Sequence, residues 1–304
     1  MSVNLQVNLG GLIMKNPVTT ASGTFASGME YSQFVNIESL GALTTKGVSL
    51  HGWAGNASPR IAETPSGMLN SIGLQNPGVK TFIEKDLTWL STKEVPVIVN
   101  VSGHSQNEYL EVIEALEDQE VVSAYEINIS CPNVDAGGMT IGCHTKSVEN
   151  IVGACRKASK KPMIVKLTPN VTDITEIAKA AQAAGADALS LINTVLAMAI
   201  NIKTRRPQLA RVVGGLSGPA IKPIALRMVY ETYQAVDIPL LGMGGISSAE
   251  DAIEFMLAGA RAVAIGTANF IHPQTTIKVI EGIEDYAKAQ GIKDINEITG
   301  GILC

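Results

Sequence analysis

The chain has 304 residues, of which 46% are hydrophobic and 17% are charged, so it holds enough apolar material for a sizeable core. Its formal net charge is −5 and its lysines and arginines are scattered, which argues against a nucleic-acid-binding surface. The four cysteines form no CxxC pair and the four histidines do not group, so we assign no metal site.

Short β-rich segments alternate with helical patterns along most of the chain. Residues 3–9 and 12–14, separated by Gly10-Gly11, predict a leading hairpin. Eight strands are predicted after it, and several are apolar runs typical of strands covered on both faces. They span residues 17–20, 42–46, 95–101, 124–129, 162–167, 188–192, 238–241 and 262–265.

Helical patterns fill most of the segments between these strands. In residues 172–184, five apolar side chains share one face at helical spacing: Ile174, Ile177, Ala178, Ala181 and Ala184. Ser247 is the predicted N-cap of a later helix, with Glu250 three residues on, and Gly259 ends that helix. Eight strand-then-helix units predict a (β/α)₈ TIM barrel with residues 1–304 as a single domain. A doubly wound sheet is the structural alternative.

Active sites of such barrels lie at the carboxyl ends of the strands, so the residues that follow each strand are the candidates for function. After the fourth strand, a polar loop offers Ser130, Cys131 and Asn133, and Pro132 ends the strand because it has no N–H to donate. Cys131 is therefore the first candidate for the chemistry, although free cysteine is often a buried small hydrophobe. The long polar segment 51–74 follows the second strand and is expected at the same face.

Glycines follow the last two predicted strands. Gly244 and Gly245 come after the seventh strand, and Gly266 and Thr267 come after the eighth. Glycine lets backbone N–H groups approach a phosphate, and these two loops are the usual phosphate site of a barrel. With Gly218 in the preceding loop they predict a bound phosphate group; the alternative is that the glycines only make tight turns.

Lys46 and Lys166 end two apolar strands. Lys166 is expected to point into the barrel mouth, where an ammonium needs an anionic partner such as a phosphate, a carboxylate or a reduced flavin ring. The alternative is a surface lysine whose stem lies along the rim. Asparagines near the same face suit a planar ligand with amide edges, although each alone also fits a turn. They are Asn70, Asn100, Asn128, Asn133 and Asn193.

Together these motifs resemble those of the class 1 dihydroorotate dehydrogenases over nearly the whole chain. The matching segments are residues 21–23, 45–47, 70–76, 128–133, 166–167, 192–194, 242–246 and 266–267. The resemblance implies an FMN-binding (β/α)₈ barrel that oxidises dihydroorotate to orotate in pyrimidine synthesis. It also implies that Cys131 is the base that takes a proton from C5 while hydride leaves C6 for the flavin.

The resemblance assigns two overlapping sets of binding residues. The flavin-binding positions are Ser22, Lys46, Gly47, Asn100, Asn128, Lys166, Ile192, Gly218, Gly244, Gly245, Gly266 and Thr267. The substrate-binding positions are Lys46, Asn70, Ser71, Ile72, Gly73, Leu74, Asn128, Asn193 and Thr194.

The run Cys-Pro-Asn-Val-Asp-Ala-Gly-Gly at 131–138 is similar to the NAD-linked B type of this family. The B type implies an iron–sulfur flavoprotein partner that carries FAD and a [2Fe–2S] cluster and passes electrons to NAD⁺. The implied complex is a heterotetramer of two catalytic and two electron-transfer subunits. Ile141-Gly142-Cys143-His144 stands where B-type chains commonly have Phe-Gly-Thr-Asp, which leaves Cys143 as a second candidate thiol.

Three alternatives stay open on the sequence. They are a fumarate-linked A-type enzyme, a dihydropyrimidine dehydrogenase-like FMN enzyme, and a non-catalytic barrel that binds a phosphate ligand. No segment has the pattern of a signal peptide, and the apolar stretch 186–202 is too interrupted by polar residues for a membrane span. With free thiols, this predicts a cytoplasmic protein.

Overall fold

A computed structural model gives the structure of residues 3–130 and 141–303. Within these residues, eight parallel strands form one sheet in the order β3-β16-β15-β10-β9-β8-β7-β4. They are β3 (Val18–Thr20), β4 (Leu43–Thr44), β7 (Val97–Val101), β8 (Val122–Asn128), β9 (Met163–Lys166), β10 (Ala188–Leu191), β15 (Leu240–Met243) and β16 (Ala260–Ile265). Each matches a predicted strand with its ends within two residues. The cyclic order confirms the predicted barrel over a doubly wound sheet.

Threonine side chains join β3 and β4, the two strands at the ends of this sheet order. Thr20 Oγ1 lies 3.3 Å from the Thr44 carbonyl oxygen and accepts from the Thr44 N–H at 3.1 Å. The hydroxyls of Thr19 and Thr44 lie 3.2 Å apart, and all three side chains are buried. Side chains therefore hold together the two edges at which the sheet closes on itself.

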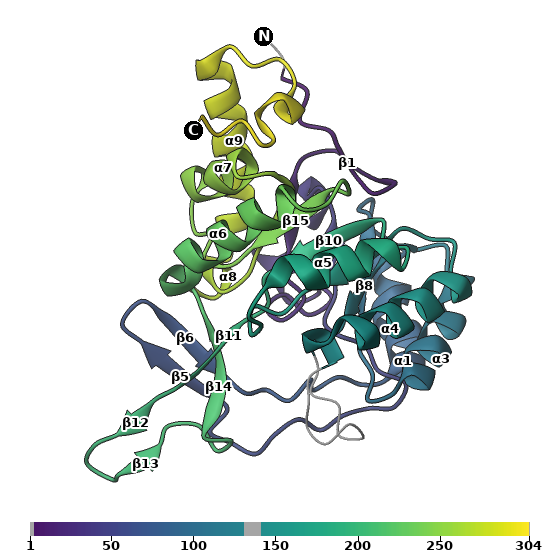
Figure 1. Cartoon of the computed structure of the whole chain (residues 1–304), viewed down its shortest axis with the longest axis vertical. Helices are drawn as coiled ribbons and strands as arrows, with labels where there is room; N and C mark the ends of the chain where they lie inside the picture. Colours follow the sequence, from purple (N-terminus) through teal and green to yellow (C-terminus); the bar gives the residue numbers. More distant parts are fainter. Residues whose placement is uncertain (1–2, 131–140, 304) are drawn as a thin grey trace.

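Helices cover the outside of the barrel (Figure 1). They are α3 (Gln106–Glu117), α4 (Thr145–Ala158), α5 (Ile174–Ala183), α6 (Lys222–Tyr233), α7 (Ala249–Leu257), α8 (Ala268–Ile271), α9 (Thr275–Gln290) and the continuous segment α1 (Val79–Thr81), η3 (Phe82–Leu87) and α2 (Thr88–Leu90). Between β3 and β4 the structure has two 3-10 helices, η1 (Tyr31–Gln33) and η2 (Ile37–Ser39), where a regular repeat would have an α-helix. Among the described residues no helix is long and apolar enough to cross a membrane. That residues 1–304 form a single domain stays a prediction.

The cap of α7 differs from the predicted one by one residue. Ser248, not Ser247, is the N-cap, and its hydroxyl accepts from the N–H of Asp251, which takes the place predicted for Glu250. The Asp251 carboxylate accepts from the backbone N–H of Ser247 and of Ser248, and Lys222 of α6 contacts it at 2.7 Å. Ser247 with Glu250 and Ser248 with Asp251 both have the spacing of a capping box. The contact between Lys222 and Asp251 favours the pair Ser248 with Asp251.

The leading hairpin is present as β1 (Val7–Leu9) and β2 (Leu12–Met14). Its turn residue Gly10 has φ +61°, and a Cβ there would lie 2.3 Å from the carbonyl oxygen of Asp187, just before β10. The hairpin turn therefore packs against the amino-terminal end of the barrel, opposite the predicted site.

The predicted long loop 51–74 is partly strand, which corrects the sequence-based expectation. It contains β5 (Ile61–Thr64) and β6 (Gly67–Asn70), which pair with each other and then with β14 (Val213–Ser217) and β11 (Val195–Met198) from the segment after β10. Beyond this sheet, β12 (Ile200–Asn201) and β13 (Arg206–Pro207) form a projecting tip (Figure 1). We call β5, β6 and β11–β14 the arm. Its strands are short, and β5 and β11 alternate exposed and half-buried residues, unlike the barrel strands, which are covered on both faces.

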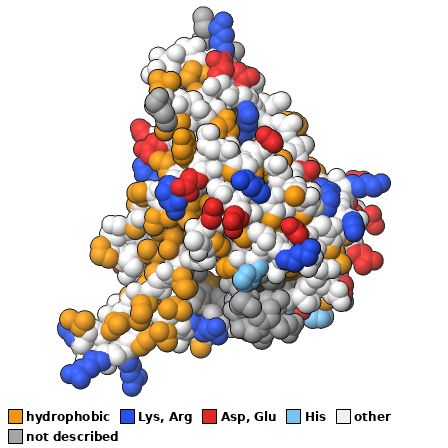
Figure 2. Space-filling view, viewed as in Figure 1, with side chains coloured by type: hydrophobic (Ala, Val, Ile, Leu, Met, Phe, Trp, Pro, Cys, Tyr) orange, Lys and Arg blue, Asp and Glu red, His pale blue; other side chains and the backbone are white. Residues whose placement is uncertain are grey.

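The arm presents apolar side chains to solvent. Leu196, Met198, Ile200 and Ile202 are 48–85% exposed. Figure 2 shows hydrophobic side chains gathered over the arm, with lysine and arginine side chains near its tip. The barrel core, in contrast, is formed by strand residues that are almost fully buried.

Gly10→Ala is expected to lower the free energy of unfolding by about 2–5 kcal/mol, measured by urea denaturation. The methyl group would collide with the Asp187 backbone, which adds roughly 1–3 kcal/mol to the cost of about 1–2 kcal/mol for a left-handed Ala. Gly291→Ala is the matched control, because Gly291 has φ +71° but nothing within 4 Å of its Cβ position. Equal losses in the two variants would contradict the packing of the hairpin against the barrel.

Candidate active site

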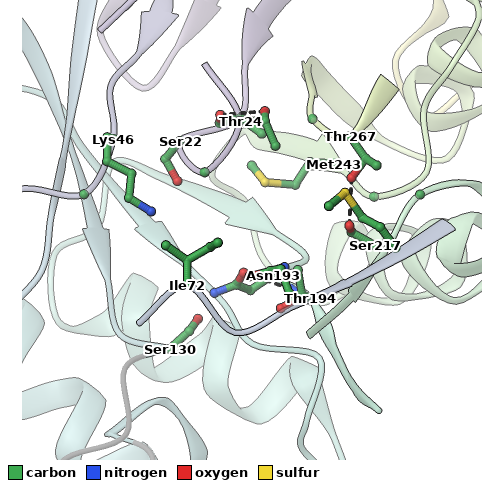
Figure 3. Close-up of a pocket in the computed structure, with 18 of the residues that line it drawn as sticks. Ser22, Thr24, Lys46, Ile72, Ser130, Asn193, Thr194, Ser217, Met243 and Thr267 are labelled. Atoms are coloured by element: carbon green, nitrogen blue, oxygen red, sulfur yellow. Dashed lines mark hydrogen bonds between the residues drawn. The ribbon is translucent and has the colours of Figure 1, made fainter. Parts of the chain in front are cut away.

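One cavity of about 820 Å³ opens at the carboxyl ends of the barrel strands, within the size range of ligand sites. Residues after all eight strands line it, together with residues of the arm (Figure 3). Every described residue that the sequence predicted as a flavin or substrate contact lines this cavity. These are Ser22, Lys46, Gly47, Asn70, Ser71, Ile72, Gly73, Leu74, Asn100, Asn128, Lys166, Ile192, Asn193, Thr194, Gly218, Gly244, Gly245, Gly266 and Thr267. Cys131 and Asn133 lie outside the described residues.

The charged lining of the cavity is cationic. Among the described lining residues, Lys46, Lys166 and Arg211 are basic and none is Asp or Glu. Lys46 is half-buried, and Figure 3 shows its ammonium group extending into the cavity between Ser22 and Ile72. A partly enclosed site with this charge favours an anionic ligand, because the walls exclude water that would otherwise screen the lysines.

Lys166 has a protein partner that the sequence did not predict. Its side chain is 5% exposed, and its Nζ lies 3.6 Å from Oε2 of Glu126 and donates to Ser22 Oγ at 3.2 Å. Glu126 is fully buried on β8 and does not line the cavity. The positive charge of Lys166 is therefore balanced by the Glu126 carboxylate inside the barrel, and not by an acidic side chain that lines the cavity.

Glycines form the wall after β15 and β16. Gly218, Gly244 and Gly245 have φ of +94°, +127° and +79°, and a Cβ on Gly245 would lie 2.9 Å from the Gly218 carbonyl oxygen. Only glycine fits such a close pair of turns, and this requirement is compatible with a phosphate bound at the same backbone. A Cβ on Gly266 would instead meet nothing closer than Ala21 at 3.4 Å. A methyl group there would make ordinary contact with Ala21, so crowding does not require glycine at this position.

Two contacts hold this glycine wall in place. Thr267 Oγ1 donates to Ser217 Oγ at 2.8 Å, which ties the loop after β16 to β14 of the arm. Behind Gly245, Lys222 contacts Asp251 at 2.7 Å, and this hydrogen bond raises the pKa of Lys222 above its usual value. The backbone that would face a phosphate is thus fixed by both the arm and the outer helices.

The amide side chains of the cavity are oriented by the surrounding backbone. Asn70 Nδ2 donates to the Gly215 carbonyl at 3.3 Å, and Asn128 Oδ1 accepts from the N–H of Ser130 at 3.2 Å. Asn193 Oδ1 accepts from the N–H of Thr194 at 2.9 Å. Asn128 Nδ2 also donates to Ser102 Oγ at 3.5 Å, whereas Asn70 Oδ1 and Asn193 Nδ2 are the amide ends that can serve a ligand. This suits the planar ring with amide edges that the sequence predicted.

The end of β8 is held on two sides. The hydroxyl of Tyr109, from α3, donates to the Asn128 carbonyl at 2.7 Å, and the Gly142 N–H donates to the Ile129 carbonyl at 2.9 Å. Cys143, the second candidate thiol, is not among the lining residues; its Sγ lies 3.6 Å from the carbonyl oxygen of Asn170. Burial raises the pKa of the Cys155 thiol to about 12, so that cysteine is unsuited to act as a base.

Several lining residues were missed by the sequence-based prediction. Trp53 and His104 line the cavity with their ring centroids 4.0 Å apart, and Arg211 reaches it from the arm. His104 follows β7 and was set aside because the histidines show no metal-ligand spacing. Its position after a barrel strand was the signal that would have found it.

Comparison with known proteins gives the same family that the sequence motifs resemble. The family model described as dihydroorotate dehydrogenase matches residues 4–286. The chain is 58% identical to the catalytic subunit of dihydroorotate dehydrogenase B (NAD⁺) of Alkaliphilus metalliredigens over 99% of both chains. It is 53% identical to the protein of the same name from Bacteroides fragilis, over 98% of this chain and 99% of that one. The crystal structure of DHODH from Eimeria tenella in complex with ferulenol has the same fold, with a TM-score of 0.82 at 21% identity, over 98% of this chain and 88% of that one.

Proposed function

The chain belongs to the dihydroorotate dehydrogenase family of FMN-dependent oxidoreductases, and on that premise we propose that it oxidises dihydroorotate to orotate in pyrimidine synthesis. The observation that carries this proposal is the cationic cavity, with Lys46, Lys166 and Arg211 and no acidic side chain among its described lining residues. FMN carries a phosphate and dihydroorotate carries a carboxylate, so both ligands match that charge.

The residues present fit FMN. The cavity of about 820 Å³ exceeds what a small acid alone needs, and the backbone of Gly266 and Thr267 lines it, where a phosphate can accept hydrogen bonds from N–H groups. In our proposal Gly218, Gly244 and Gly245 belong to the same phosphate wall. Bound FMN supplies the acceptor for the hydride that leaves C6 of dihydroorotate.

The remaining flavin contacts lie on the barrel strands. In our proposal Lys166 faces the flavin ring and stabilises the negative charge that develops there. Ser22, Gly47, Asn100 and Ile192 complete the flavin contacts. A Cβ on Gly47 would lie 2.8 Å from Asn100 Oδ1, so only glycine lets the chain pass this close to that amide.

The substrate is proposed to lie between the lysine wall and the arm. Lys46 binds the carboxylate of dihydroorotate, and Asn70, Asn128, Asn193 and Thr194 bind the amide edges of the ring. The backbone of residues 71–74 closes the site from the side of the arm. The thiolate of Cys131 takes the proton from C5, a role that rests on the family resemblance.

Electrons are proposed to leave through a partner protein. The relatives at 52–58% identity are named catalytic subunits of the NAD⁺-linked B type, which supports NAD⁺ as the final acceptor. We propose that the partner carries FAD and a [2Fe–2S] cluster and that two copies of each chain form a heterotetramer. A cytoplasmic location is proposed with it, since Cys143 and Cys155 are free thiols, which fit a reducing compartment.

Substrate identity is tested by comparing dihydroorotate with dihydrouracil, which lacks the carboxylate. With an artificial electron acceptor, dihydrouracil is expected to show at least tenfold lower kcat/KM, since a hydrogen bond to a charged group contributes about 1.5–3 kcal/mol. Lys46→Gln, in preparations matched for bound flavin, should lower kcat/KM for dihydroorotate much more than kcat/KM for dihydrouracil. Equal turnover of the two substrates by the unaltered enzyme would favour the dihydropyrimidine dehydrogenase-like alternative.

The base is tested by Cys131→Ser. This variant should still bind FMN but lose most of its turnover at neutral pH, because a serine hydroxyl ionises far less readily than a thiol. Cys143→Ser is the matched control and should keep nearly full activity, since Cys143 lies outside the cavity lining and a hydroxyl can replace its contact with Asn170. Unchanged turnover in Cys131→Ser, or the reverse order of the two variants, would overturn the assignment.

The electron acceptor is tested by purifying the chain alone and from cells that also express the genome's iron–sulfur flavoprotein candidates. The chain alone should reduce an artificial dye but not NAD⁺, and the purified complex should reduce NAD⁺ in the presence of dihydroorotate. Its mass should equal two copies of each chain. Reduction of fumarate by the chain alone would show the A type instead.

A further inference from the structure

A carboxylate lies inside the barrel directly behind the cavity wall. Glu126 is fully buried, and both of its carboxylate oxygens accept hydrogen bonds from neutral donors. Ser190 Oγ donates to Oε1 at 2.7 Å, and Asn100 Nδ2 donates to Oε2 at 2.5 Å. Lys166 Nζ, at 3.6 Å from Oε2, is near enough for an ion pair but beyond hydrogen-bond distance.

The strand register places these four side chains together. Asn100 of β7 is the register partner of Glu126 of β8, and Lys166 of β9 is the register partner of Ser190 of β10. All four are 0–4% exposed, and Asn100 and Lys166 also line the cavity. The strand register therefore brings the four side chains together, and the hydrogen bonds from Ser190 and Asn100 hold the carboxylate with Oε2 at 3.6 Å from the ammonium.

Two consequences follow for Lys166. Because neutral donors occupy the carboxylate, the lysine is not drawn into a direct hydrogen bond with it, and its ammonium donates to Ser22 at the cavity wall. At the same time, a negative charge at 3.6 Å in a low-dielectric interior offsets part of the positive charge that the ammonium presents to the cavity. The arrangement fixes both the position and the effective charge of the lysine.

We propose that Glu126 is a positioning residue that sets the reduction potential of the flavin by moderating the charge of Lys166. The inference rests on the proposed function, in which Lys166 faces the flavin ring. Negative charge develops on that ring as it takes up electrons, so an uncompensated Lys166 favours the reduced form. Glu126 lowers this preference, and Ser190 and Asn100 limit how far it does so.

The charge of Glu126 is what distinguishes this role from packing. A neutral glutamine in the same place keeps the volume and still offers an oxygen to accept from Ser190 or Asn100. Because it carries no negative charge, it does not offset the positive charge of Lys166. A purely structural role would therefore change stability without changing the potential in a defined direction.

The experiment measures the two-electron reduction potential of the bound flavin by equilibration with reference dyes. Glu126→Gln is expected to raise the potential, so that the ratio of reduced to oxidised flavin at fixed solution potential increases at least tenfold, or about 30 mV for a two-electron couple. Ser190→Ala is expected to lower it, because the hydrogen bond that holds Oε1 away from Lys166 is lost and the carboxylate can then rotate to bring Oε2 closer to the ammonium. The opposite signs do not follow from a general loosening of the barrel.

Thr19→Val is the matched control. Thr19 is buried in the same barrel and lies 3.2 Å from the Thr44 hydroxyl on the other side of the sheet closure, so its loss removes a buried hydrogen bond without altering the charge at Lys166. The potential of this variant should equal that of the unaltered protein. If Glu126→Gln does not fold, the sign of the Ser190→Ala shift decides.

Two outcomes separate the inference from the function on which it rests. A flavin-loaded protein whose potential is unchanged in Ser190→Ala, or unchanged or lowered in Glu126→Gln, would overturn the role of Glu126 alone. An unaltered protein that binds no FMN at all would overturn the proposed function.

Discussion

Parallel pairing of consecutive strands is the constraint on which the rest of the structure depends. Two parallel neighbours cannot be joined by a tight turn, so the chain must cross back over the sheet between them, and all strands then point the same way. Their carboxyl ends meet at one rim. Lys46 after β4 and Gly266 after β16 are far apart in the sequence, yet they line one cavity as a result. The topology of the sheet therefore brings these residues to one site, whatever contacts each of them makes there.

A second constraint is that a dry barrel interior accepts polar groups only in partnership. The threonines between β3 and β4 satisfy one another across the sheet closure. Glu126 of β8 is shared among Asn100 of β7, Lys166 of β9 and Ser190 of β10. These polar groups lie within or toward the rim of the barrel, where the strands give way to the cavity. The same few buried side chains therefore contribute both to the stability of the barrel and to the electrostatics of the cavity.

Much of this could be predicted from the sequence because its signals are local. An apolar strand and the polar residue that ends it are read within a few positions, so the eight strands and many lining residues of the cavity were predicted, although Trp53, His104 and Arg211 were not. The hydrogen-bond partners of Glu126 could not be predicted from the sequence. Asn100 and Ser190 are 26 and 64 residues away from it, and a single acidic residue in an apolar run does not indicate which residues it contacts. The arm was missed for the same reason, because Asn70 pairs across 145 residues. The role of Cys131 stays a prediction.

The arm is formed by two excursions of the chain, one after β4 and one after β10, whose strands pair with each other. Leu69 pairs with Leu216, and Gly67 packs so closely on Ser217 that a Cβ would lie 2.1 Å from its carbonyl oxygen. Since a slip of one residue turns every side chain of a strand to the opposite face, neither excursion can gain or lose a residue in these strands without a matching change in the other. We therefore expect the two segments to be exchangeable only together, so a chimera that exchanges substrate specificity between relatives has to transplant both.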